Sequence, residues 1–329
     1  MRRVAVATGG PSAEAEVSRA SAEGVVRALT AAGYAASAIE VGPRLASELE
    51  IAGFEVVFPV THGGPGEDGS LQGLLEIMEL PYVGSGVLAS AVAMDKPSAK
   101  AMFERHGLPV LDDWVVGAAE AARAQAASAL DRLGPSVVVK PSAGGSAIGV
   151  TILRETSEAE LIAHVESALV SGAPVLVEPF VSGLEVTCGV LEWRGRAHAL
   201  PPTEIVAKAA DFYDFTSKYA SGGSEHRCPA PLAEDVSRRV QELAVAAHLA
   251  IGARDLSRVD FIVVPARGID GITLLEINTL PGMTKTSLFP EAAAVAGIGF
   301  SELCAGLVER AATRERAEPP VVLGMPGEA

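Results

Sequence analysis

Two tripeptides late in the chain, RVD starting at position 258 and EIN starting at position 276, constrain the fold more than any other feature. Residues two apart on a strand point to the same face, so each tripeptide would place two polar side chains together. Residues 265–271 between them are rich in turn formers, which predicts an antiparallel hairpin. A symmetric hairpin sets Asp260 opposite Glu276 and Arg258 opposite Asn278.

This predicted pairing brings two carboxylates, an amide oxygen and a guanidinium to one patch of sheet. Opposed carboxylates repel each other unless positive charge compensates them. Oxygen ligands of this kind suit Mg²⁺ or Mn²⁺, and such Mg²⁺ sites usually carry substrate phosphates. A solvated face of an ordinary hairpin is the alternative, which the apolar residues flanking both tripeptides disfavour.

The composition limits what the protein can bind. Its formal net charge of −15 disfavours nucleic acid and anionic membranes as partners, because both attract basic surfaces. With 329 residues, 49% of them hydrophobic, the chain can form two or three domains with substantial cores. The three cysteines form no CxxC pair, and no apolar run approaches transmembrane length. We therefore expect a soluble, cytoplasmic protein.

The first third of the chain alternates short apolar runs with helical patterns. Candidate strands lie at 4–7, 36–41 and 54–60, and a helix is expected over about 12–32. This alternation is typical of βαβ units, so it predicts an α/β fold that begins with a Rossmann-like parallel sheet. Further along, Asp95 followed by Pro97 marks the start of another helix.

Lys140 ends an expected strand and precedes a glycine-bearing turn that runs from Ser142 to Ser146. Backbone N–H groups of such a turn can surround phosphate oxygens while the lysine supplies charge. The order is not that of a Walker A loop, because the lysine precedes the glycines. An ordinary tight turn is the alternative; Lys96 and the distant hairpin favour the phosphate interpretation.

Glu178 and Glu185 follow another buried strand, where they could accept hydrogen bonds from adenine and ribose groups or simply be solvated acids. Glu14 and His62 each follow a strand of the expected parallel sheet. Ligands bind at the carboxyl ends of such strands, although Glu14 could instead complement a helix dipole and His62 could be structural. No GxGxxG pattern is present, which disfavours a nicotinamide-dependent oxidoreductase.

Two loops complete the candidate site. Residues 211–219 are aromatic in an aromatic-poor chain and predict a lid over a ligand, with an ordinary surface loop as the alternative. Residues 279–287 leave the second hairpin strand. There Gly282 could offer a backbone N–H to an oxyanion and Ser287 could hold a carboxylate, although glycine after proline is also common in turns.

Taken together, these segments resemble the ATP-grasp superfamily and, within it, the D-alanine–D-alanine ligases. The resemblance runs in the family's order up to about residue 312 and rests on GGPSAEAEVS (9–18), HGGPGEDGSLQG (62–73), PYVGSG (81–86), MDK (94–96), VVVKP (137–141), FYDFTSKY (212–219), RVD (258–260) and EINTLPGMT (276–284). It implies three domains, over 1–94, 95–184 and 185–314, with a disordered tail over 315–329. The last two domains would hold ATP between them, and the third would carry the metal site and the lid.

In this family ATP phosphorylates the carboxylate of one D-alanine, and the amino group of a second attacks the acyl phosphate. The resemblance implies nucleotide contacts at Lys96, Lys140, Ser146, Glu178, Val181, Glu185 and Lys218. It implies two Mg²⁺ ions, or Mn²⁺, held by Asp260, Glu276 and Asn278. It implies substrate contacts at Glu14, His62 and Ser287. It implies catalytic roles for Arg258 and the Gly282 N–H at the oxyanion, for Lys218 at the transferring phosphate, and for a bridge of Glu14, Ser146 and Tyr219 that latches the lid.

The family resemblance leaves the second substrate open. Ala143 and Ala147 stand where the family usually has polar side chains, whereas the latch residues are kept. A ligase that makes D-alanyl-D-lactate or another D-amino-acid dipeptide is the alternative function. A nucleotide-binding protein without catalysis is disfavoured, because the hairpin residues are intact. The resemblance also implies a homodimer.

Overall fold

A computed structural model describes residues 1–12, 14–145, 148–170, 172–193, 195–207, 224–284 and 286–314. The first part of the chain forms a parallel three-stranded sheet with the order β2-β1-β3 and four helices. Its elements are β1 (Arg3–Thr8), α1 (Ala15–Ala31), β2 (Ala35–Glu40), α2 (Leu45–Ala52), β3 (Val56–Pro59), α3 (Ser70–Ile77) and α4 (Val87–Met94). The predicted parallel sheet is confirmed. Helix α1 begins at Ala15, later than expected, with Glu14 as its N-cap; the Glu14 N–H donates to the Ser12 hydroxyl at 3.2 Å.

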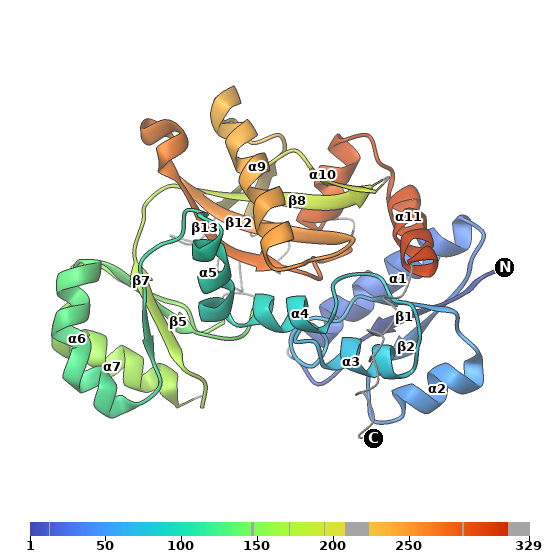
Figure 1. Cartoon of the computed structure of the whole chain (residues 1–329), viewed down its shortest axis with the longest axis horizontal. Helices are drawn as coiled ribbons and strands as arrows, with labels where there is room; N and C mark the ends of the chain where they lie inside the picture. Colours follow the sequence, from blue (N-terminus) through green and yellow to red (C-terminus); the bar gives the residue numbers. More distant parts are fainter. Residues whose placement is uncertain are drawn as a thin grey trace, which may run out of the picture.

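The middle of the chain forms an antiparallel four-stranded sheet with the order β4-β7-β5-β6. Its elements are β4 (Trp114–Val116), α6 (Ala119–Leu133), β5 (Val137–Pro141), β6 (Thr151–Leu153), α7 (Glu158–Leu169) and β7 (Val175–Pro179). The two helices pack together against this sheet at one end of the molecule (Figure 1). A cluster of buried side chains from these elements forms a core of its own.

The last part of the chain forms an antiparallel sheet with the order β11-β10-β8-β12-β13, to which β9 adds beside β8. Its strands are β8 (Leu184–Trp193), β9 (Arg196–Ala199), β10 (Thr203–Ala207), β11 (Ser224–Arg227), β12 (Leu256–Val263) and β13 (Ile272–Asn278). Its helices are α9 (Glu234–Ala250), the 3₁₀ turn η1 (Pro265–Gly271), α10 (Leu288–Val295) and α11 (Phe300–Thr313). Helix α5 (Lys96–Arg105) packs into the same core as α9 and β12.

Helix α11 returns to the parallel sheet and lies beside α1 (Figure 1). Side chains from α1, β1, β3, α10 and α11 share one buried apolar cluster. The first and last parts of the chain are therefore joined by packing, whereas the four-stranded sheet has its separate core.

The predicted hairpin register is confirmed at its polar end. Arg258 pairs with Asn278 and Asp260 pairs with Glu276. The assumption of a symmetric hairpin is wrong beyond this point, because the register shifts by one residue after Asp260. The shift leaves Leu275 as a bulge residue, so that Leu275 and Glu276 both line one cavity while their neighbours in β13 remain in the core.

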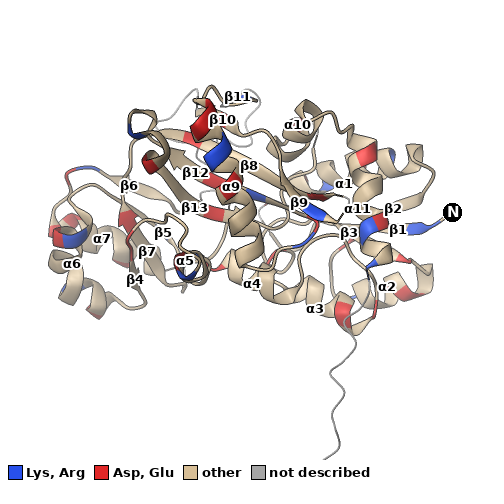
Figure 2. Ribbon diagram, turned by 45° about the horizontal axis from the view of Figure 1, so that its top comes forward, with Lys and Arg blue, Asp and Glu red and all other residues tan. Residues whose placement is uncertain are grey.

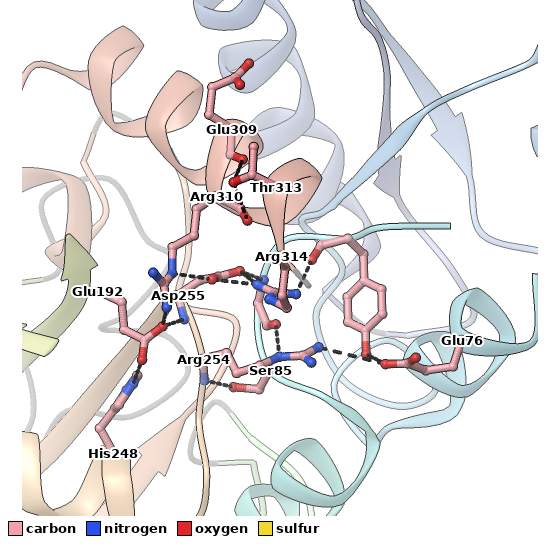
Figure 3. A network of polar contacts seen from close by, with 12 residues as sticks. Glu76, Ser85, Glu192, His248, Arg254, Asp255, Glu309, Arg310, Thr313 and Arg314 are labelled. Carbon is pink, nitrogen blue, oxygen red and sulfur yellow. Dashed lines mark hydrogen bonds and ion pairs between the residues drawn. The ribbon is translucent and has the colours of Figure 1, made fainter. Parts of the chain in front are cut away.

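The carboxylate of Asp255, just before β12, is fully buried and lies at the centre of a polar network (Figure 3). It accepts from Arg314 at 2.5 and 2.6 Å, from Arg310 at 2.9 Å and from the Gly84 N–H at 2.7 Å. Glu192 on β8 accepts from the Asp255 N–H at 3.0 Å and also pairs with Arg310. A buried carboxylate needs such partners. This network therefore fixes the start of β12 relative to the segment around Gly84, between α3 and α4.

The mixed α/β class with a parallel N-terminal sheet is thus observed, while the domain boundaries at 94 and 184 stay a prediction. The expected tail over 315–329 lies outside the described residues. Across the described ranges, no single helix is both long and apolar enough to cross a membrane; α10 and α11 pass that test only together, with a bend of 104° between them.

Changing Glu192 to Gln should destabilise the protein in a pH-dependent manner. Burial alone would raise the pKa of Glu192, but His248, the Asp255 N–H and Arg310 outweigh it and hold the pKa at about 2, below the ordinary 4.5. The charged form therefore adds stability above pH 4.5 that is lost as the pH falls towards 2. Because the Glu192 side chain is partly exposed and solvent screens its charge, we expect a loss of about 1–2 kcal/mol at pH 7.

Urea unfolding between pH 7 and pH 2.5 measures this difference, with the exposed Glu302→Gln on α11 as the matched control. The difference between wild type and Glu192→Gln should shrink below pH 4.5. A difference that stays constant across this range would contradict the electrostatic origin.

Candidate active site

A cavity of about 280 Å³ lies between the four-stranded sheet and the β12–β13 hairpin. Ala143 and glycines of the loop after β5 form part of its lining. Strand residues of the four-stranded sheet and of the sheet that contains β12 and β13 also line it. The predicted site residues that line it are Lys96, Lys140, Glu178, Val181, Glu185, Arg258, Asp260 and Glu276. Segments separated by more than a hundred residues in the sequence thus meet around one space.

Arg258 and Asp260 of β12 and Glu276 of β13 line this cavity. The ribbon shows acidic and basic positions close together around β12 and β13 (Figure 2). The Arg258 guanidinium donates to both Asp260 oxygens, at 2.9 and 2.8 Å. Thr187 on β8 donates to Asp260 at 2.6 Å. Lys96 Nζ lies 3.6 Å from the Glu276 carboxylate. The opposed carboxylates are therefore compensated by Arg258 and Lys96 from two elements.

The oxygen atoms of Asp260, Glu276 and Asn278 are ligands of the type that suits a hard divalent cation. Asp260 and Glu276 are cross-strand partners, and Asn278 adds an amide oxygen from the same strand as Glu276. Asn278 Oδ1 accepts from the Leu280 N–H at 2.8 Å, which leaves its second lone pair for another partner. Among the described residues, no group of three or more His, Cys, Asp or Glu side chains forms a metal site. The predicted set contains only two acids and relies on Asn278 as its third oxygen ligand.

Glu178 on β7 is held by two lysines in the cavity wall. Its carboxylate lies 2.5 Å from Lys140 Nζ and 2.5 Å from Lys100 Nζ. All three side chains are buried. Burial alone would raise the pKa of Glu178, but Lys140 and Lys100 outweigh it and hold the pKa below its ordinary value. The carboxylate is therefore charged at neutral pH and acts as a hydrogen-bond acceptor.

The loop after β5 is connected to the first turn of α5. The backbone N–H of Lys96 donates to the Ser142 carbonyl at 2.9 Å, and its Nζ donates to the Gly144 carbonyl at 2.7 Å. Asp95, the observed N-cap of α5, pairs with Ala143 in an isolated bridge. Burial lowers the pKa of Lys96 and Lys140 lowers it further, although Glu276 opposes both. Lys96 thus connects the glycine loop to the hairpin carboxylates.

Glu14 and His62 are both buried after strands of the parallel sheet. Burial lowers the pKa of His62, but Glu67 and Glu14 outweigh it and raise the pKa above its ordinary value, against the charge of Arg258. His62 Nε2 is buried without a hydrogen-bond partner in the described part of the chain. A buried nitrogen in this state favours a ligand nearby, since unsatisfied polar atoms are costly.

Gly282 and Ser287 lie together in the loop after β13. A Cβ on Gly282 would come within 2.8 Å of the Ser287 hydroxyl, so this approach requires glycine. The same hydroxyl accepts from the Thr284 N–H at 3.0 Å and lies 2.7 Å from Thr284 Oγ1. These two predicted residues are thus neighbours. They do not line the cavity described above, nor do Glu14, His62 and Asn278.

Three predicted residues, Ser146, Lys218 and Tyr219, lie outside the described residues, as does the expected lid over 211–219. Their predicted roles at the phosphate and in the latch stay predictions.

Comparison with known proteins decides the family. The model described as "D-ala D-ala ligase C-terminus" matches residues 102–309, and that described as "D-ala D-ala ligase N-terminus" matches residues 36–85. The D-alanine–D-alanine ligase of Xanthobacter autotrophicus is 45% identical over 316 residues, which cover 94% of this chain and 98% of that protein. The chain belongs to the D-alanine–D-alanine ligase family.

Further relatives agree with this assignment. The D-alanine–D-alanine ligase of Acidiphilium cryptum is 46% identical over 316 residues, covering 95% of this chain and 100% of that protein. The solved structure of D-alanine–D-alanine ligase from Bacillus anthracis complexed with ATP matches with a TM-score of 0.79 at 28% identity, covering 94% of this chain and 97% of that one. The predicted ATP-grasp fold class of this ligase family member is therefore confirmed.

Lys100 is the residue that the sequence interpretation missed in this ligase site. It lies four residues after Lys96, so both occupy neighbouring turns on one side of α5. This spacing of Lys96 and Lys100 is visible in the sequence and could have indicated that both lysines face the site. In a helix that starts at a cap, however, a second lysine resembles an ordinary solvated side chain, and only its contact with Glu178 distinguishes it.

Replacing Glu178 with Gln should strongly destabilise the protein, because Lys100 and Lys140 would lose the carboxylate that pairs with both. Breaking a buried ion pair by removing one partner costs about 3–5 kcal/mol. Urea unfolding at pH 7 measures the loss. The control is Glu166→Gln, which removes the partner of the exposed Arg123 and should cost less than about 1 kcal/mol. Equal losses in the two variants would contradict this account of the cluster.

Proposed function

We propose that the chain is an ATP-dependent ligase that joins two D-alanines into D-alanyl-D-alanine for peptidoglycan synthesis. One observation carries the proposal. Lys96, Lys140 and Glu178 line the same cavity as Arg258, Asp260 and Glu276, so that nucleotide-binding and acid-rich groups face each other. Phosphoryl transfer requires this combination of positioning and charge compensation. Membership of the ligase family supports it.

ATP would occupy this cavity with its base near the β7 end. The charged Glu178 carboxylate accepts from the adenine amino group, the backbone near Val181 contacts the base, and Glu185 accepts from ribose hydroxyls. Lys96 and Lys140 meet the phosphates. Asp260, Glu276 and Asn278 would hold two Mg²⁺ ions, or Mn²⁺, and the bound cation neutralises phosphate charge.

The first D-alanine would lie beside Glu14 and His62, with its ammonium group on the Glu14 carboxylate. Its carboxylate oxygen attacks the γ-phosphorus, ADP leaves, and a D-alanyl phosphate forms. The second D-alanine, held through its carboxylate by Ser287, attacks the carbonyl carbon with its amino group. Phosphate then leaves and the amine loses a proton. Arg258 and the Gly282 N–H stabilise the oxyanion of this second step.

The proposed enzyme works in the cytoplasm as a homodimer on small-molecule substrates. Its net charge of −15 disfavours nucleic acid and anionic membranes as partners. The local cluster of Lys96, Lys140 and Arg258 supplies the positive charge that a polyanionic nucleotide needs in such an acidic protein.

Phosphate release from ATP, measured over a substrate panel, tests the proposed function. Release should require D-alanine and Mg²⁺ or Mn²⁺, should stop with a chelator, and should be weak with L-alanine or D-lactate. Asp260→Ala should lower kcat by about 100-fold or more, because it removes a ligand of the cation that would compensate transition-state charge. Asp270→Ala, on the exposed turn of the same hairpin, is the matched control. Strong release with L-amino acids and none with D-alanine would overturn the proposal.

A further inference from the structure

Lys100 on α5 has no role in the function proposed above, although it is one of the most buried charged residues of the chain. Its side chain is 4% exposed. Its Nζ lies 2.5 Å from Glu178 Oε1 and 3.9 Å from Asp113 Oδ1. The rest of α5 buries Ala99 and Phe103 in the core shared with α9 and β12. Lys100 therefore extends from one core to a carboxylate on the neighbouring sheet.

The two lysines around Glu178 differ in what else they can reach. Among the described residues, those lining the cavity include Glu178 and Lys140 but not Lys100. Lys140 contacts Oε2 of the carboxylate from the cavity side, and Lys100 contacts Oε1 from α5. A ligand in the cavity can thus compete for Lys140, while Lys100 stays behind the wall.

We propose that Lys100 is a positioning residue for nucleotide recognition: it holds the Glu178 carboxylate from behind, so that Lys140 can turn to ATP while Glu178 faces the adenine amino group. This inference rests on the proposed function, since it assigns Glu178 to the base of ATP.

The electrostatics of the cluster explain why a second lysine is needed. If Lys140 were the only partner of Glu178, its movement to a phosphate would leave a buried carboxylate without compensation, which is strongly unfavourable. With Lys100 in place, Glu178 remains paired whether or not Lys140 turns away. A carboxylate has about four lone-pair sites, so Glu178 can accept from an amino group while it keeps Lys100.

Asp113 balances the remaining charge. The cluster of Lys100, Lys140, Glu178 and Asp113 contains two positive and two negative groups, and Asp113, like Lys100, is not among the residues that line the cavity. The resting cluster is therefore neutral overall. When Lys140 turns to a phosphate, Lys100 remains between two carboxylates as their shared cation.

The experiment compares Lys100→Met with wild type in the full chain. Lys100→Met keeps an unbranched side chain only one atom shorter and removes its charge. We measure kcat and KM for ATP and for D-alanine, and the preference for ATP over purine riboside triphosphate, which lacks the adenine amino group. The KM for ATP should rise by about tenfold or more, and the preference for ATP should fall by a similar factor, as expected for loss of a charge-assisted hydrogen bond. The KM for D-alanine should change by less than about twofold, since Lys100 does not reach the D-alanine residues.

Two control variants separate positioning from packing. Lys100→Arg keeps the charge and should restore most of the preference for ATP. Arg123→Met, which removes the charge of an exposed ion pair on α6, should behave like wild type. If Lys100→Met does not fold, Lys100→Gln takes its place with the same expectation.

An unchanged KM for ATP together with an unchanged base preference would overturn the inference. So would an equal loss in the ATP and D-alanine parameters that Lys100→Arg does not rescue, because that result describes packing alone. Calorimetric binding of ADP and of purine riboside diphosphate gives the same comparison without turnover. If wild type releases no phosphate with D-alanine, the proposed function fails, and this binding comparison still decides the role of Lys100.

Discussion

The buried carboxylate of Asp255 holds the two halves of the ligase site in one arrangement. It lies one residue before β12, and its partners come from the segment after β3 and from α11. Its backbone has φ +62°, a left-handed conformation that asparagine and aspartate tolerate better than most residues. Because Arg258 and Asp260 follow within five residues, this network fixes the hairpin relative to the parallel strands that precede Glu14 and His62. The proposed geometry between D-alanine and the phosphate-binding groups depends on this network.

The nucleotide side of the cavity is attached in a different way. The four-stranded sheet has its own apolar core, and α5 belongs to the core of the last sheet. Polar contacts join the two: Lys96 reaches the Gly144 carbonyl, and Lys100 reaches Glu178. The wall formed by the β12–β13 hairpin is thus held by packing. The opposite wall, formed by the four-stranded sheet, is joined to it through charged side chains of α5. An anionic nucleotide bound as proposed would act directly on the second kind of contact, since Lys96 of α5 faces the cavity.

Much of this arrangement could be predicted from the sequence where local rules decide it. The pairing of Asp260 with Glu276 followed from strand alternation and a turn of suitable composition. The cap at Asp95 followed from its position before Pro97, and in the structure its carboxylate accepts from the Ser98 N–H. The bulge at Leu275 could not be predicted, because it depends on how the 3₁₀ turn η1 closes.

Contacts between distant residues were equally inaccessible to sequence patterns. Asp255 binds groups 171 and 59 residues away, and Lys100 binds a carboxylate 78 residues away. No periodicity or spacing rule connects such pairs. The family resemblance supplied the predicted roles of the site residues, but it said nothing of Lys100, which does not line the cavity.

The central claim is that the carboxylate of one D-alanine is phosphorylated in the cavity between Lys140 and the hairpin. D-alanine labelled with ¹⁸O in both carboxylate oxygens tests this claim most directly when the released phosphate is examined by ³¹P NMR. The account predicts that each phosphate carries one ¹⁸O atom, because the oxygen that attacks the γ-phosphorus leaves with phosphate when the amide bond forms. Unlabelled phosphate released in step with dipeptide would contradict it.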